Sequence, residues 1–139
     1  MKAIKTMFAL SIITLSGCAA LDQIAQDMQS VIPQQEQITS TLPAICQAAK
    51  DNEVKANSLY KNKLLIGTGK IDLIMESYKI GTPYTVTIKT GNVSVFAGVK
   101  NERTVMNLKV DQNTSFSGTV DSVKNDFNGC SIWLTDSSF

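Results

Sequence analysis

The chain has 139 residues, of which 43% are apolar and 18% are charged, and its net charge is +1. This length is enough for one domain but not for two, and so small a net charge falls far short of that of a dedicated nucleic-acid binder. The chain contains no histidine, which excludes histidine-based catalytic triads and histidine-ligated metal sites.

The N-terminus has the layout of a secretory signal. Lys2 and Lys5 precede an apolar run at residues 7–15, and this run is too short to span a bilayer, which takes about 20 residues. Small residues follow at positions 16 and 17. We expect residues 1–17 to be a signal peptide that is removed from the mature protein.

Residues 15–18, Leu-Ser-Gly-Cys, resemble the bacterial lipobox at all four positions. The resemblance implies that Cys18 is acylated, palmitate being one expected chain, and that it becomes the first residue of the mature protein. Ala19 follows, where an aspartate would imply retention in the inner membrane. The expected location is therefore the bacterial envelope, lipid-anchored to the outer membrane and facing the periplasm. The alternative is an ordinary cleaved signal followed by an incidental cysteine.

Charge and composition divide the mature chain. Residues 18–54 carry one basic and five acidic residues, whereas residues 55–139 carry ten basic and seven acidic residues. We interpret residues 18–51 as a lipid-anchored stalk with short helices, and residues 52–139 as the folded domain.

Three short helices are expected before the domain's strands. The first covers residues 18–32 and ends at Pro33, the second begins near Thr41 with Pro43 in its first turn, and the third covers residues 52–60. The apolar sides of the second and third helices are expected to comprise Ile45, Cys46, Ala48, Ala49, Val54, Ala56 and Tyr60.

From residue 64 onward the apolar residues alternate, which predicts strands. Turn residues at 91–92, 111–113 and 128–129 separate them, and a polar stretch at 100–107 is inserted before the fourth strand. The five expected strands cover residues 64–77, 84–89, 93–99, 114–123 and 130–134. A long, bent first strand and five strands in total predict a mainly β domain folded as a small closed barrel.

The first strand contains the run Gly67-Thr68-Gly69-Lys70. The apolar phase changes across it, from Leu64 and Ile66 to Ile71, Leu73 and Met75, which predicts a β-bulge at the glycines. A phosphate-binding loop is excluded, because its pattern requires glycine at position 64 and serine or threonine at position 71.

Cys46 and Cys130 are the only candidates to pair with each other once Cys18 is acylated. A secretory signal implies an oxidising compartment, so we expect a disulfide, with two buried free thiols as the alternative. With both cysteines paired and no histidine, a transition metal has no ligand set. We expect no catalytic residues, no metal and no cofactor, and hence a protein that is not an enzyme.

Three segments resemble the tRNA-anticodon-like family of OB-fold domains. Ala56 and Tyr60-Lys61 followed by residues 65–71 match the family's opening pattern, A-x3-Y-K and then V-x-G-x-I. Residues 108–120 resemble its segment L-K-x-G-x-x-V-x-V-x-G-x-V, and residues 129–134 its last strand. The family's turn glycine is replaced here by Asp111-Gln112-Asn113. The resemblance implies a five-stranded, OB-fold-type Greek-key barrel in an α+β chain, preceded by short N-terminal helices.

An OB-fold offers the outer face of its second and third strands for binding. On that face the alternation exposes Lys89 and Phe96, with Lys100 and Arg103 just beyond, and these four are the candidate ligand-binding residues. Two functions stay open. One is a binding or scaffold module that contacts an envelope protein or glycan, and the other is binding of single-stranded nucleic acid.

Overall fold

The structure is a computed structural model, and it describes residues 34–77 and 81–139. All the described helices and strands belong to one compact unit, Gln35–Phe139. The expected signal peptide, Cys18 and the expected helix at 18–32 lie outside the described residues. Within those residues, no helix combines the length and apolar character that crossing a membrane requires.

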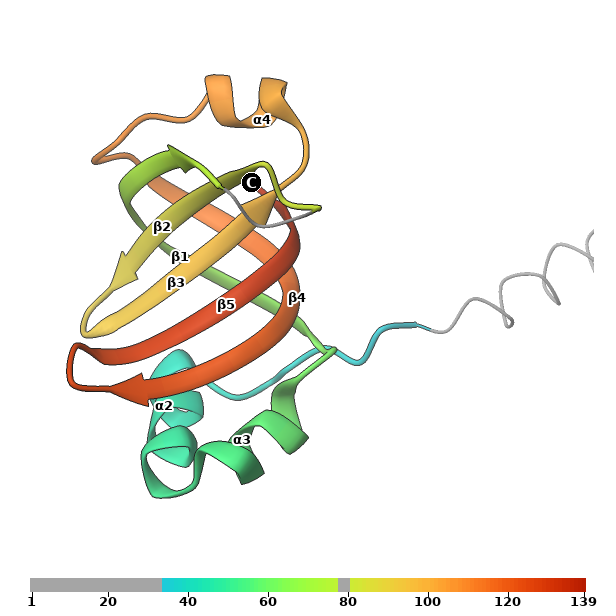
Figure 1. Ribbon diagram of the computed structural model, residues 1–139, viewed down its shortest axis with the longest axis vertical. Coiled ribbons are helices and arrows are strands. Elements are labelled where there is room, and N and C mark those ends of the chain that lie inside the picture. Colours follow the sequence, from blue (N-terminus) through green and yellow to red (C-terminus); the bar gives the residue numbers. More distant parts are fainter. Residues whose placement is uncertain (1–33, 78–80) are drawn as a thin grey trace, which may run out of the picture. The chain divides into compact units, whose positions relative to one another are not determined.

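Five strands form a closed barrel in the order β1-β2-β3-β5-β4, with β4 pairing back onto β1 (Figure 1). The strands β3 and β5 are parallel and every other pair is antiparallel. This barrel confirms the predicted fold class. The strands are β1 (Leu64–Glu76), β2 (Tyr84–Thr90), β3 (Val93–Val99), β4 (Asn113–Asp126) and β5 (Gly129–Ser138).

Three short helices cover the two ends of the barrel: α2 (Leu42–Asp51) and α3 (Glu53–Tyr60) lie at one end, and α4 (Glu102–Met106) lies at the other (Figure 1). The helices α2 and α3 begin where the sequence predicts. Thr41 caps α2 by accepting a hydrogen bond from a backbone N–H, and Pro43 occupies the first turn, where its missing N–H costs nothing. The polar stretch between β3 and β4, which we expected only as an insertion, contains α4.

The barrel interior is filled by the alternating residues of the strands. Val86, Ile88, Val95 and Ala97 are fully buried, as their spacing in β2 and β3 predicts. On α3 the prediction holds for Ala56, which is fully buried, but not for Val54, whose side chain is 82% exposed. Only one face of α3 meets the barrel, and Val54 lies outside it.

The expected course of β1 needs correction. Leu65 faces the interior, while Ile66 is 51% exposed, so the inward phase is offset by one residue from the prediction. Residues 64–70 pair with β4 without a break, and the register irregularity lies between Ile71 and Leu73 instead of at the glycines. The glycines therefore belong to a regular strand segment.

The inward residues of this part of β1 were predicted wrongly because two of them, Gly67 and Gly69, have no side chain and so add nothing to the apolar pattern. A Cβ at Gly67 would lie 2.6 Å from the ring Cζ of Phe116. A Cβ at Gly69 would lie 2.6 Å from Ile88 Cγ2 and 2.8 Å from the carbonyl oxygen of Lys89. Neighbouring side chains already fill this part of the interior, so only glycine fits at both positions.

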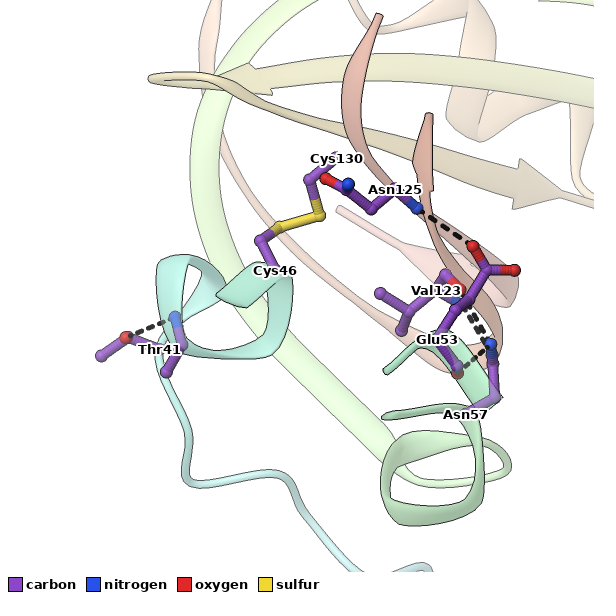
Figure 2. The surroundings of a disulfide bond; sticks show 8 residues. Thr41, Cys46, Glu53, Asn57, Val123, Asn125 and Cys130 are labelled. Atoms are coloured by element: carbon purple, nitrogen blue, oxygen red, sulfur yellow. Dashed lines mark hydrogen bonds between the residues drawn. A yellow bond between two sulfur atoms is a disulfide. The ribbon is translucent and has the colours of Figure 1, made fainter. Parts of the chain in front are cut away.

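Cys46 of α2 and Cys130 of β5 form a disulfide, as the sequence predicts, with their Cα atoms 5.6 Å apart (Figure 2). The two residues come together because Cys46 lies on the apolar side of α2, next to the fully buried Ile45, and Cys130 is an inward residue of β5. The disulfide attaches α2 covalently to the end of the barrel.

The helix α3 completes an open edge of β4. The pairing of β4 with β1 ends at Thr119, so the backbone groups beyond it need other partners. The side-chain amide of Asn57 donates to the carbonyl oxygen of Val123 and accepts from its N–H, both at 2.8 Å (Figure 2). Glu53 accepts from the N–H of Asn125 at 3.3 Å. These side chains replace the missing strand.

Candidate ligand-binding face

The four predicted ligand-binding residues follow β3 from one end to the other. Lys89 pairs in register with Ser94 near the β2–β3 turn, and its ammonium donates to the Ser94 hydroxyl at 2.9 Å. Phe96 lies in the middle of the strand, Lys100 follows its last residue, and Arg103 belongs to α4. At about 3.3 Å per residue, Ser94 and Lys100 are about 20 Å apart. The four residues therefore form an extended row and not a compact pocket.

Of the three cations in this row, one is neutralised by a neighbouring carboxylate. Lys100 forms a salt bridge with Asp136 of β5, an exposed residue with a positive φ of 51°. Lys89 and Arg103 have no ion pair among the described residues. The row thus offers two uncompensated cations at opposite ends of β3.

Phe96 has an aromatic partner that the sequence analysis did not place beside it. Trp133 of β5 is opposite Phe96 in the parallel β3–β5 register, and the two rings stack with centroids 4.4 Å apart and planes 13° apart. The alternation in β5 predicts that Trp133 faces outward, but nothing in the sequence shows that β5 lies beside β3. The outer face therefore carries two aromatic side chains instead of one.

The stacked rings stand on edge on the sheet. Neighbouring strands are about 4.8 Å apart, close to the separation of the two centroids, so the rings stack along the direction from strand to strand. Their edges point outward and only the outer two faces are free of the stack. On the β2 side Phe96 neighbours Thr87, which is buried, and on the β4 side Trp133 neighbours Ser122. A flat platform for bases, which single-stranded nucleic acid uses, is thus not the arrangement here.

Apolar residues extend the aromatic pair toward β1. Leu73 pairs in register with Thr87, and Met75 pairs with Thr85, so both lie on the same outer face. Their side chains are 45% and 47% exposed. We call Leu73, Met75, Phe96 and Trp133 the outer apolar strip. Its residues come from β1, β3 and β5, and Thr85 and Thr87 of β2 lie between Leu73 and Met75 on one side and Phe96 on the other.

The sequence did not predict this strip, because the expected phase of β1 placed Leu73 and Met75 inside the barrel. The irregularity between Ile71 and Leu73 reverses the two sides of β1 at that point. These four residues could be placed on one face only if the bulge in β1 were located correctly. The bulge lies between Ile71 and Leu73, and not at Gly67 and Gly69.

Among the described residues, no three or more Cys, Asp or Glu side chains come together in a group that could hold a metal ion. At the rim of the barrel the carboxylate of Asp111 lies 2.7 Å from the ammonium of Lys70, and the hydrogen bond and charge of this carboxylate raise the lysine's pKa. This ion pair is exposed, and it joins Lys70 of β1 to the turn before β4.

Asp111 also explains the departure from the family's turn glycine. Its φ is 69°, in the left-handed region that favours glycine and that aspartate and asparagine tolerate better than most residues. Asp111 therefore occupies a backbone conformation that a glycine adopts readily.

Comparison with known proteins supports the fold. A crystal structure from Klebsiella pneumoniae subsp. pneumoniae, named a "putative nucleic acid-binding lipoprotein", matches this chain with a TM-score of 0.55 and 19% sequence identity. The match covers 84% of this chain and 94% of that one. No family model matches the chain, and no curated protein matches it. At this identity the likeness establishes a shared barrel fold, and the tRNA-anticodon-like family remains a resemblance.

Proposed function

We propose that this chain is a lipid-anchored protein of the bacterial envelope whose barrel binds a protein partner through the outer apolar strip. The observation that carries the proposal is the stacked pair Phe96–Trp133, which lies on the same outer face as the exposed Leu73 and Met75, with threonines of β2 between them. Contiguous exposed apolar surface of this kind marks interaction sites, and aromatic residues contribute most of the binding energy in protein interfaces.

The lipid anchor rests on the lipobox resemblance at Cys18, and it agrees with the name of the Klebsiella structure. A disulfide in the barrel also fits an oxidising compartment such as the periplasm. An outer-membrane location facing the periplasm follows from Ala19 and belongs to the same proposal.

A matched pair of leucines gives a sharp test of the strip. Leu73 in the strip and Leu59 in α3 are each 45% exposed. We expect Leu73→Ser and Trp133→Ser in the full chain to lose partners that the wild type captures from envelope extracts, while Leu59→Ser keeps them. Equal capture by all three variants would refute binding through the strip. Partners that are glycans instead of proteins would be recognised by their resistance to protease.

Single-stranded nucleic acid is the second candidate, and the specific observation in its favour is the row Lys89–Phe96–Lys100–Arg103 along β3. Aromatic residues beside cations suit a chain of bases and phosphates, and the name of the Klebsiella structure mentions such binding. Trp133 is the only tryptophan in the chain, so its fluorescence reports directly on this face. If the barrel binds single-stranded nucleic acid, titration with oligodeoxythymidine should change that fluorescence, and the measured affinity should fall steeply as salt is added. If it does not, the fluorescence should stay unchanged.

A further inference from the structure

The turn between β4 and β5 presents a fully exposed aromatic side chain. Phe127 is at the tip of this hairpin and its side chain is completely accessible to solvent. Asp126 precedes it, and the Asp126 carboxylate accepts a hydrogen bond from the N–H of Asn128 at 2.9 Å, which orders the turn. An aromatic residue held outward on an ordered turn, with no contact inside the described part of the chain, is suited to insert into another surface.

A groove of about 440 Å³ lies directly beside this turn. Its walls come from α2, from the β2–β3 turn and from the base of the β4–β5 hairpin, and they include Pro43, Val93 and the disulfide Cys46–Cys130. The wall is mainly apolar, and its volume is sufficient for an aromatic ring. Lys50 of α2 is the only charged residue that lines the groove.

The groove and the hairpin tip are complementary in charge as well as in polarity. Lys50 has no ion pair among the described residues, and Asp126 is the only charged residue at positions 125–129. If Phe127 of another molecule enters the groove, the carboxylate of Asp126, the residue before it, would therefore come close to the ammonium of Lys50 in the groove wall.

The two features are also adjacent on the same surface. Asn125 and Gly129, which flank the tip, themselves line the groove. The phenyl group of Phe127 cannot readily fold back into a groove formed by the base of its own hairpin. A second copy rotated by 180° would place its own groove opposite this Phe127 and its own Phe127 opposite this groove. Each copy would then contribute one Phe127 and receive one, as a two-fold interface requires.

We propose that two copies of this chain associate at the α2 end of the barrel, each inserting Phe127 into the groove of the other, with Lys50 of each copy paired to Asp126 of its partner. A contact limited to a hairpin and a groove is smaller than a standard stable interface, so the association is weak and depends on concentration. It leaves the outer apolar strip free, and it does not depend on the function proposed above.

Co-expression of two differently tagged full chains, with capture of one and detection of the other, tests this arrangement. Phe127→Ser is expected to lower the recovered second copy about tenfold, as removal of a central aromatic anchor does. The matched control is Val54→Ser, a similarly exposed apolar residue on α3, which is expected to change nothing. Equal loss in both variants, or recovery unaffected by Phe127→Ser, would overturn the proposal.

Changing the two charges gives an independent test. Lys50→Glu alone places like charges together and is expected to reduce the association, whereas Lys50→Glu combined with Asp126→Asn, which keeps the side-chain oxygen that accepts from the Asn128 N–H, is expected to recover part of it. A photoreactive benzoylphenylalanine in place of Phe127 should form a cross-link of twice the monomer mass, with the attachment point in residues 43–50 or 90–93. A cross-link to a protein of another mass, or no recovery when Asp126→Asn is added to Lys50→Glu, would rule out the proposed dimer.

Discussion

Glycine at an inward position of a strand leaves room in the barrel interior that a neighbouring side chain occupies. The ring of Phe116, which is almost completely buried, occupies the volume in front of Gly67. The pattern of apolar residues cannot reveal such a position, because glycine has no hydrophobicity to contribute to the alternation. This is why the phase at the start of β1 was predicted incorrectly, whereas β2 and β3, which have a side chain at every inward position, were predicted correctly.

We expect Gly67→Ala to destabilise the protein by about 1–3 kcal/mol, because the new methyl group overlaps a ring that has no room to move. Urea unfolding of the oxidised protein measures this change. Combining Gly67→Ala with Phe116→Leu removes the end of the ring and is expected to destabilise by less than the sum of the two single changes. Strict additivity would show that the two positions do not share this space.

At the scale of the elements, the short helices α2 and α3 stabilise one end of the barrel by a covalent bond to β5 and by hydrogen bonds to β4. The helix α2 is fixed by a disulfide, and α3 supplies polar side chains to an unpaired edge of β4 (Figure 2). The cysteine pairing followed from the sequence because only one partner was available. The role of Asn57 could not be predicted, since its partner Val123 is 66 residues away and an amide side chain on a polar helix gives no distinguishing signal.

Loss of the disulfide is expected to lower the free energy of unfolding by about 2–5 kcal/mol, because the bond closes a long loop in the unfolded chain. The comparison is between the wild type and Cys46→Ala with Cys130→Ala, which leaves no free thiol to react. Mass measurement without reductant should find the wild type two hydrogens lighter than its reduced form. Free thiols in the oxidised protein would contradict the pairing.

Asn57→Ala leaves the backbone N–H and carbonyl of Val123 without their partners in a part-buried position. An unpaired polar group of this kind costs about 1–3 kcal/mol, and we expect destabilisation in that range. Hydrogen exchange at the Val123 amide should accelerate more than exchange at the opposite end of β4. Ser58→Ala on the same helix, where the hydroxyl bonds only to the helix backbone, is the control.

At the scale of the whole molecule, the barrel class followed from five alternating segments, but the arrangement of its outer face did not. Phe96 and Trp133 are 37 positions apart in sequence and become neighbours only through the parallel pairing of β3 with β5. Of the predicted candidates, Lys89 and Phe96 lie on the same side of the β2–β3 sheet, whereas Arg103 belongs to α4 at the end of the barrel (Figure 1). The salt bridge of Lys100 with Asp136 joins segments that local patterns cannot connect.

Anchoring is a further property of the whole chain, and it rests on one residue outside the described range. We expect Cys18→Ser to release the protein from the membrane, because acyl chains provide the hydrophobic area for stable attachment. Fractionation of cells that express the full chain measures the distribution. Ser16→Ala, which keeps a small residue that the lipobox accepts and leaves the cysteine in place, separates a loss of acylation from a general defect in export. A Cys18→Ser protein held as firmly as the wild type would contradict the lipid anchor.

The position of the disulfide has a mechanical consequence. Cys46 and Cys130 are 84 residues apart, and the bond between them shortens the covalent path across the domain to a single step. Once the backbone hydrogen bonds between residues 36–38 and Leu64 are broken, a pull on the N-terminal segment is transmitted from α2 directly into the start of β5. The chain between the two cysteines, which contains β1 to β4, then carries none of that load in series. The segment before Cys46 can be stretched, but β1 to β4 cannot be drawn out from that end while the sulfurs remain joined.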